Sequence, residues 1–176
     1  MPKRLVVAIL TSTMAVAAGA VAGCGSGAQH PDDGGLQDAD FAQCDMTPAV
    51  DYMPGMQATS MSGGYVATVV SARTDFSDGS PSVDTAASGG LDTWVVSFAD
   101  TTAGTPAAIT MMAEKPWMPI HKHGASTFPL VTPGDPGTFT VSKMDLFMLG
   151  YWSIVFDLQP TSGVADKVTF AVCIRQ

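Results

Sequence analysis

Two stretches near the carboxyl end of the chain decide the fold: residues 151–158, YWSIVFDL, and residues 167–174, KVTFAVCI. In both, a large apolar residue stands at every second position. These positions are Trp152, Ile154, Phe156 and Leu158 in the first stretch, and Val168, Phe170, Val172 and Ile174 in the second. Because successive side chains of a β-strand point to opposite faces, this pattern predicts two strands that each bury one face.

Similar short runs extend the pattern toward the middle of the chain. They are residues 65–71, 93–99, 107–113, 126–131 and 139–146. Clusters of Gly, Pro, Asp and Ser separate the runs, and these residues favour turns. No stretch after residue 23 has the apolar spacing of an amphipathic helix of ten residues or more. The sequence therefore predicts an all-β fold, an immunoglobulin-like β-sandwich of about seven strands, over residues 61–176.

The amino-terminal residues have the zones of a bacterial lipoprotein signal peptide. Lys3 and Arg4 precede an uncharged, apolar run at 5–22, and residues 21–24, VAGC, resemble the lipobox. We expect a signal peptide at 1–23 and lipidation of Cys24. The alternative is a single transmembrane anchor, but the run has about 18 residues, barely enough to span a bilayer, and no basic cluster follows it.

The residues after Cys24 indicate where the protein is held. Gly25 follows the lipidated residue, and by resemblance to Gram-negative lipoprotein sorting this lacks the inner-membrane retention signal. We expect a location in the bacterial cell envelope, anchored to the outer membrane and facing the periplasm. Residues 25–43 are rich in Gly, Asp and Gln, so residues 24–60 are predicted to form a flexible tether between membrane and domain.

The charge of the chain excludes one class of partner. Without residues 1–23, 6 basic and 16 acidic residues remain, which gives a formal charge of 6 − 16 = −10. Such a surface repels phosphate backbones, and the sequence has no basic stripe that would reverse this locally. Nucleic acid is therefore not expected to bind.

Two cysteines remain once Cys24 is acylated. Cys44 and Cys173 would meet in an oxidising compartment, where a pair is more often bridged than free. We predict a disulfide between them, with two separate buried thiols as the alternative.

Candidate metal ligands lie in residues 114–124, EKPWMPIHKHG. His121 and His123 are two positions apart, so in an extended segment both rings leave the same face. Two imidazoles on one side suit Cu, Zn or Ni, and Met118 could add a soft thioether. The alternative interpretation is that the imidazoles bind backbone carbonyls or are solvated, and that the methionines fill core space.

The order of several residues resembles a known family. Met118-Pro119, His121, His123, Gly137 at the start of a strand, and Met148, Gly150 and Trp152 at alternate positions occur together. This order resembles the YtkA-like and FixH-like group of small exported β-sandwich domains, over roughly residues 93–174. The resemblance implies that Met118, His121, His123 and Met148 gather at one end of the sandwich. It also implies copper as the bound metal and a role in handling copper or assembling copper enzymes. Lys122 departs from the group, which often has a small residue there.

Other function classes fit less well or stay open. The chain lacks a Gly-x-Ser-x-Gly elbow, a phosphate loop and a dinucleotide fingerprint, so enzyme activity is not expected. The sequence predicts a lipid-anchored periplasmic metal-binding domain, with copper the first choice of metal and a copper protein or another envelope protein as partner. The alternative is a metal-free protein-interaction module of the envelope, in which Trp117 anchors a partner.

Overall fold

The computed structural model describes residues 44–45 and 48–175. The predicted signal peptide at 1–23, the lipidation site Cys24 and the tether residues before Cys44 lie outside the described residues. No helix within the described ranges is long and apolar enough to cross a membrane.

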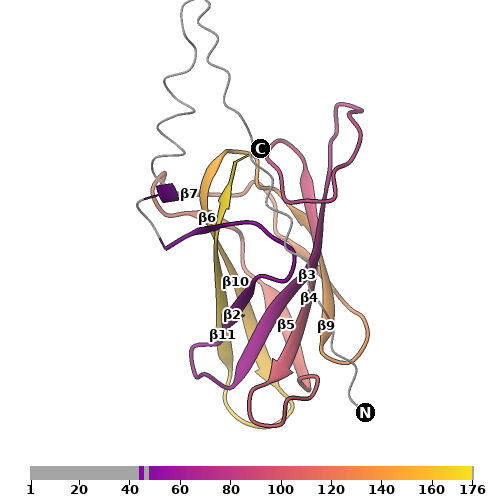
Figure 1. Cartoon of the computed structure of the whole chain (residues 1–176), viewed down its shortest axis with the longest axis vertical. Helices are drawn as coiled ribbons and strands as arrows, with labels where there is room; N and C mark the ends of the chain where they lie inside the picture. The colour runs from indigo at the N-terminus through magenta and orange to yellow at the C-terminus, as the bar shows by residue number, and fades with distance from the viewer. Residues whose placement is uncertain (1–43, 46–47, 176) are drawn as a thin grey trace, which may run out of the picture. The chain divides into compact units, whose positions relative to one another are not determined.

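The described residues form a β-sandwich of two sheets (Figure 1). One sheet has the order β2-β3-β4-β9-β8, and the other has the order β1-β11-β10-β6-β7, with β5 also paired to β10. The strands are β1 (Val50–Asp51), β2 (Gln57–Thr59), β3 (Tyr65–Asp75), β4 (Leu91–Asp100), β5 (Ile109–Ala113), β6 (Trp117–Met118), β7 (His123–Gly124), β8 (Leu130–Pro133), β9 (Thr138–Met144), β10 (Gly150–Pro160) and β11 (Asp166–Ile174).

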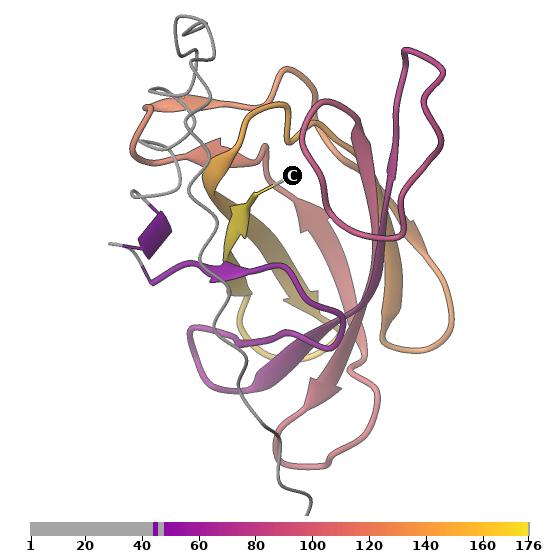
Figure 2. The same ribbon diagram turned by 45° about the horizontal axis from the view of Figure 1, so that its top comes forward.

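The seven longer strands have the immunoglobulin arrangement. Strands β3-β4-β9-β8 form one sheet and β11-β10-β5 the centre of the other, which is the A-B-E-D and G-F-C order of a constant-type domain. Their pairings are all antiparallel. Figure 2 shows the two sheets from a second direction, with the connections between sheets at both ends. The predicted all-β, immunoglobulin-like sandwich is confirmed.

Each predicted strand segment overlaps a strand of the structure, with ends that differ by up to four residues; the prediction extends furthest beyond a strand at 126–129. Residues 126–129, included in the predicted run 126–131, are not in a strand: 126 and 127 are bends, and β8 begins only at Leu130. Ser126 is turned away from strand pairing because both its backbone N and its hydroxyl donate to Asp145. The short strands β1, β2, β6 and β7 have too few residues to show an alternating pattern.

The expected domain boundary at residue 61 is too late for the described fold. β1 pairs in parallel with β11, and β2 pairs with β3. Met56 is 8 % exposed and belongs to the hydrophobic core. Residues 48–60, included in the predicted tether, are therefore held by backbone hydrogen bonds to both sheets and by apolar contacts.

The core lies between the inward faces of the two sheets. Aromatic edge-to-face contacts run from Trp94 to Phe170, on to Phe156, and then to Phe98, with ring centroids 6.0–6.3 Å apart. Trp94 and Phe98 lie on β4, while Phe156 and Phe170 lie on β10 and β11, so the chain of rings connects the two sheets. Each inward position is one of those predicted from the alternating pattern.

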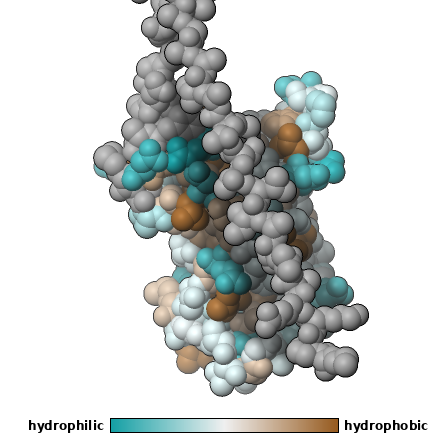
Figure 3. All heavy atoms as spheres, in the orientation of Figure 1, coloured by the Kyte–Doolittle hydropathy of each residue, from teal (hydrophilic) through white to brown (hydrophobic). Residues whose placement is uncertain are grey.

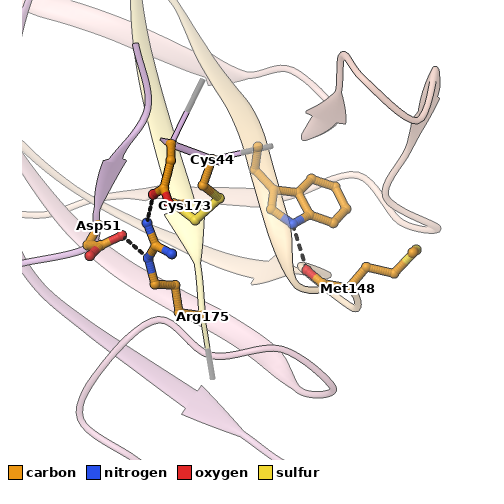
Figure 4. The surroundings of a disulfide bond; sticks show 7 residues. Cys44, Asp51, Met148, Cys173 and Arg175 are labelled. Atoms are coloured by element: carbon orange, nitrogen blue, oxygen red, sulfur yellow. Dashed lines mark hydrogen bonds and ion pairs between the residues drawn. A yellow bond between two sulfur atoms is a disulfide. The ribbon is translucent and has the colours of Figure 1, made fainter. Parts of the chain in front are cut away.

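A disulfide joins Cys44 to Cys173, as predicted. Cys173 lies in β11 directly opposite Tyr151 of β10 and Asp51 of β1. Arg175 reinforces this junction, since its Nε donates to Asp51 at 2.6 Å and its Nη2 to Asp45 at 2.8 Å (Figure 4). The segment around Cys44 is therefore attached to the sandwich next to the start of β10.

Candidate functional site

The candidate site is built on the strand segment that follows β5 along the edge of β10. Ala113 lies opposite Phe156, and Trp117 lies opposite Ser153. Four residues of this edge therefore match three residues of β10, because one extra residue is accommodated within 114–116 as a β-bulge. Pro116 lies in this stretch and has no N–H to donate to a neighbouring strand.

The bulge decides which side chains face the core. Without the bulge, the side chains of residues 113, 115 and 117 would share the inward face. The extra residue shifts the alternation by one position, so each side chain after the bulge points to the face opposite the one it would otherwise take. Trp117 consequently points outward and is 46 % exposed, whereas Met118 points inward and is fully buried.

Strands β6 and β7 form a short hairpin that carries both histidines. Met118 lies directly opposite His123, so their side chains leave the same face of the hairpin. Lys122 closes the turn by donating its backbone N–H to the Met118 carbonyl at 2.8 Å, and it has a left-handed φ of 57°. A glycine adopts that conformation more easily than a lysine does.

The two imidazoles lie side by side, but not for the expected reason. The extended conformation assumed for 121–123 is wrong, because residues 119–122 form the turn of the hairpin. The turn nevertheless brings the rings of His121 and His123 to a centroid distance of 5.7 Å, tilted by 48°. Both residues are half-buried.

An aromatic column supports His123. Phe147 stacks on the His123 ring at 5.6 Å and 24°, and its own edge contacts the buried Trp152 at 5.7 Å. Phe147 was not among the predicted site residues. Its signal was the apolar run Phe147-Met148-Leu149 outside any alternating segment, immediately before Gly150, because such a run is typical of a connection that packs against the domain.

Met148 belongs to the same connection. Its carbonyl accepts a hydrogen bond from Trp152 Nε1 at 2.9 Å, and its half-buried side chain packs against the core. Figure 4 shows the Met148 side chain extending away from the Cys44–Cys173 disulfide. Met148 is adjacent in sequence to Phe147, the residue that stacks on His123.

The donor types restrict the chemistry of this site. Within the described ranges, no three His, Cys, Asp or Glu side chains come together in a way that could hold a metal ion. Beside the two imidazoles, the hairpin offers the thioether of Met118, which lies opposite His123. Thioethers favour Cu(I), whereas Zn(II) in proteins is typically bound by His, Cys and carboxylate.

The other methionines have different surroundings. Met111 is buried and Met112 is 70 % exposed, as expected for neighbours on a strand. Met56 lies in the core, while Met53 is 58 % exposed. Because Met53 and Met56 face different environments, they do not form a paired thioether site in this structure.

A buried acidic residue lies outside the candidate metal site. Asp92, at the start of β4, is fully buried, and burial raises the pKa of its carboxyl to about 7. Its Oδ1 lies 2.6 Å from Thr74 Oγ1, which is also 2.8 Å from the Thr85 carbonyl. A hydroxyl carries one hydrogen, so both contacts are hydrogen bonds only when the Asp92 carboxyl is protonated and donates. No sequence pattern pointed to this network.

Comparison with known proteins found no matching family model, curated protein or solved structure.

Proposed function

We propose that this chain is a lipid-anchored metal-binding domain of the bacterial envelope, and that it holds Cu(I) at the β6–β7 hairpin. His121 and His123 provide the imidazole ligands, and Met118 and Met148 provide thioether. The YtkA-like and FixH-like resemblance of the sequence is part of this proposal. Delivery of copper to a partner protein, or assembly of a copper enzyme, is the corresponding role.

The observation that carries the proposal is the arrangement of the hairpin. A coordinated imidazole nitrogen lies about 2.0–2.1 Å from its metal, so two rings with centres 5.7 Å apart can flank one ion. Met118 lies opposite His123, at a Cβ separation of about 4.5–5.5 Å for such a pair. A thioether is thus supplied from the core side, where its sulfur is shielded from water.

The position of the hairpin favours transfer of the ion rather than storage. The hairpin lies at one end of the sandwich, beside the start of β10 (Figure 1), and both histidines keep part of their surface exposed, although Nε2 of His121 is buried. A partner or chelator can therefore approach from the imidazole side. We expect bound Cu(I) to exchange rapidly with a competing chelator.

A titration of the soluble chain 25–176 tests the proposal. Cu(I) is kept reduced with ascorbate, so that no thiol reductant opens the Cys44–Cys173 bridge, and a chromophoric chelator competes for the ion. We expect one ion per chain and a loss of at least about a hundred-fold in affinity in the His121→Ala/His123→Ala variant. His30→Ala is the matched control, since it removes a histidine outside the hairpin, and should change affinity less than two-fold. Equal affinity of the double variant and the parent would overturn the proposal.

The metal-free interaction module remains the second candidate function. Trp117 supports it, because this large aromatic is 46 % exposed and lies across Gly124 of the hairpin. Exposed tryptophan is typical of recognition surfaces. If the chain binds no copper, this surface is where a partner should be sought.

A further inference from the structure

We propose that the hairpin end of the sandwich is a docking surface for an anionic lipid bilayer. This surface consists of Trp117, Ile120, Phe128 and Phe147 with Lys115, Lys122 and Lys143, and is called the hairpin-end surface below. The inference goes beyond copper binding. It uses the proposed lipid anchor only for orientation, and the surface itself is tested without the anchor.

The apolar part of the surface is large for so acidic a protein. Phe128 is 71 % exposed, Trp117 46 %, and Ile120 and Phe147 each 40 %. Large apolar side chains that carry this much exposure mark interaction sites when they lie close together. Figure 3 shows that, on the face drawn there, apolar and hydrophilic side chains alternate instead of forming one apolar band.

Contacts between neighbouring segments join these side chains into one region. Lys115 Nζ lies 5.0 Å from the centre of the Phe128 ring. Thr127, beside Phe128 in the chain, donates its hydroxyl to the Lys143 carbonyl at 3.0 Å. Phe147 stacks on His123 on one face of the hairpin, and Trp117, the neighbour of Met118 in β6, leaves the other face at the same end of the sandwich.

The basic side chains fall into two groups, one at the hairpin-end surface and one elsewhere on the sandwich. Six basic residues follow residue 23. Arg73, Lys167 and Arg175 form ion pairs with carboxylates. Lys115, Lys122 and Lys143 form none with the described residues, and all three lie at the hairpin-end surface. Asp145 also lies there, and Ser126 donates to its carboxylate through both its backbone N and its hydroxyl. Unpaired lysines next to exposed aromatics are the combination that binds anionic lipid.

The path of the chain places this surface toward the membrane. The disulfide attaches Cys44 to β11 opposite Tyr151, just after the 145–149 connection that carries Phe147. Figure 1 shows β6, β7 and the C-terminus at the same end of the sandwich. Cys24 lies twenty positions before Cys44, and even a fully extended chain of that length spans at most about 70 Å.

Vesicle binding by the unlipidated chain 25–176, with a copper chelator present, tests the surface. Trp94 and Trp152 are fully buried, so a change of tryptophan emission on docking, and its quenching by brominated lipid, reports on Trp117. We expect binding to phosphatidylcholine vesicles that contain phosphatidylglycerol, and at least ten-fold weaker binding to phosphatidylcholine alone. At low salt each Lys→Gln change at Lys115, Lys122 or Lys143 should weaken binding by about five-fold.

Matched variants separate the surface from general charge and apolar effects. Lys167→Gln changes the net charge equally at an ion-paired site, and Val164→Ser removes an apolar side chain that is 86 % exposed in the β10–β11 turn. Both should bind vesicles like the parent, whereas Phe128→Ser should bind at least five-fold more weakly. Equal binding to the two vesicle types, no binding to either, or no effect of the lysine changes would overturn the proposal, and the surface would then belong to a protein partner. Copper binding by the Lys115→Gln and Lys143→Gln variants, measured separately, should be unchanged.

Discussion

At the scale of single residues, the buried carboxyl of Asp92 holds the long loop between β3 and β4 against the sandwich. Its Oδ1 contacts Thr74 on β3 at 2.6 Å and the backbone N–H of Ala87 at 3.3 Å. Its second oxygen accepts no hydrogen bond from the described residues. The ionised carboxylate is therefore poorly compensated, and the nearby charge of Asp145 raises the pKa further.

This arrangement makes stability depend on pH in a specific direction. The unfolded carboxyl ionises near 3.8 and the folded one near 7. As the pH rises, the unfolded state releases its proton first, so the free energy of unfolding falls between about pH 4 and 7 and is level above that range. The loss amounts to at most about 4 kcal/mol.

Asp92→Asn should remove this pH dependence. The Asn amide can donate to Thr74 as the protonated carboxyl does, and it does not ionise. Urea denaturation at pH 5 and pH 8 should show a smaller difference for the variant than for the parent, with the variant more stable at pH 8. If parent and variant lose stability equally between the two pH values, another group is responsible.

The residues of the candidate site were predictable by type and not by geometry. His121, His123 and Met118 stand out in the sequence because imidazole and thioether are metal ligands. The left-handed φ of Lys122 and the stacking of Phe147 on His123 depend on the turn and on a connection some 24 residues further along the chain. No short-range pattern encodes such contacts.

At the scale of elements, the bulge between β5 and β6 determines the properties of the hairpin. It places Met118 in the core and Trp117 on the outside. A regular strand through 109–118 would have exposed the thioether and buried the indole. One extra residue thus supplies both the proposed ligand and the exposed aromatic.

Two substitutions of the same type test the bulge. Met118→Ala should lower the free energy of unfolding of the metal-free chain by about 2–5 kcal/mol, because it leaves a cavity in the core. Met112→Ala, at a position that is 70 % exposed, should change it by less than about 0.5 kcal/mol. Chemical denaturation of both variants gives the comparison, and similar losses would mean that Met118 does not face the core.

The long strands were predictable, while the short ones were not. β10 and β11 each bury one alternating set of large apolar residues, and that period is visible in the sequence. β1 and β6 have two residues each, and they pair only because the neighbouring long strands offer free edges. Residues 48–60 likewise contain no run long enough to show an alternating pattern, so their part in the fold was not predicted.

At the scale of the whole molecule, the disulfide encloses almost all of the sandwich. Cys44 and Cys173 are 129 residues apart, and both are 2 % exposed. A bridge that closes so long a loop restricts the unfolded chain strongly and contributes about 4–5 kcal/mol on the loop-entropy model.

Cys44→Ala/Cys173→Ala should therefore unfold at a lower urea concentration than the parent. The seven long strands do not depend on the bridge, so the variant should keep its β-sheet circular dichroism in the absence of denaturant. A variant as stable as the parent would show that the bridge acts only as a local fastening of the chain before β1.

The arrangement of the molecule connects its two proposed properties. Three features lie together near the start of β10. They are the hairpin with the imidazoles, the exposed lysines and aromatics, and the disulfide that attaches the amino-terminal side of the chain. A copper site at this end would face the membrane surface, so a partner that receives the ion would itself be expected at or in the membrane.

X-ray absorption of the Cu(I)-loaded chain 25–176 tests the central claim most directly, since it reports the atoms bound to the metal. Copper bound at the hairpin should have a coordination shell with two imidazole nitrogens, identified by their ring scattering, and at least one sulfur at about 2.3 Å. The imidazole scattering should disappear in the His121→Ala/His123→Ala variant. A copper shell without imidazole in the parent chain would contradict the account.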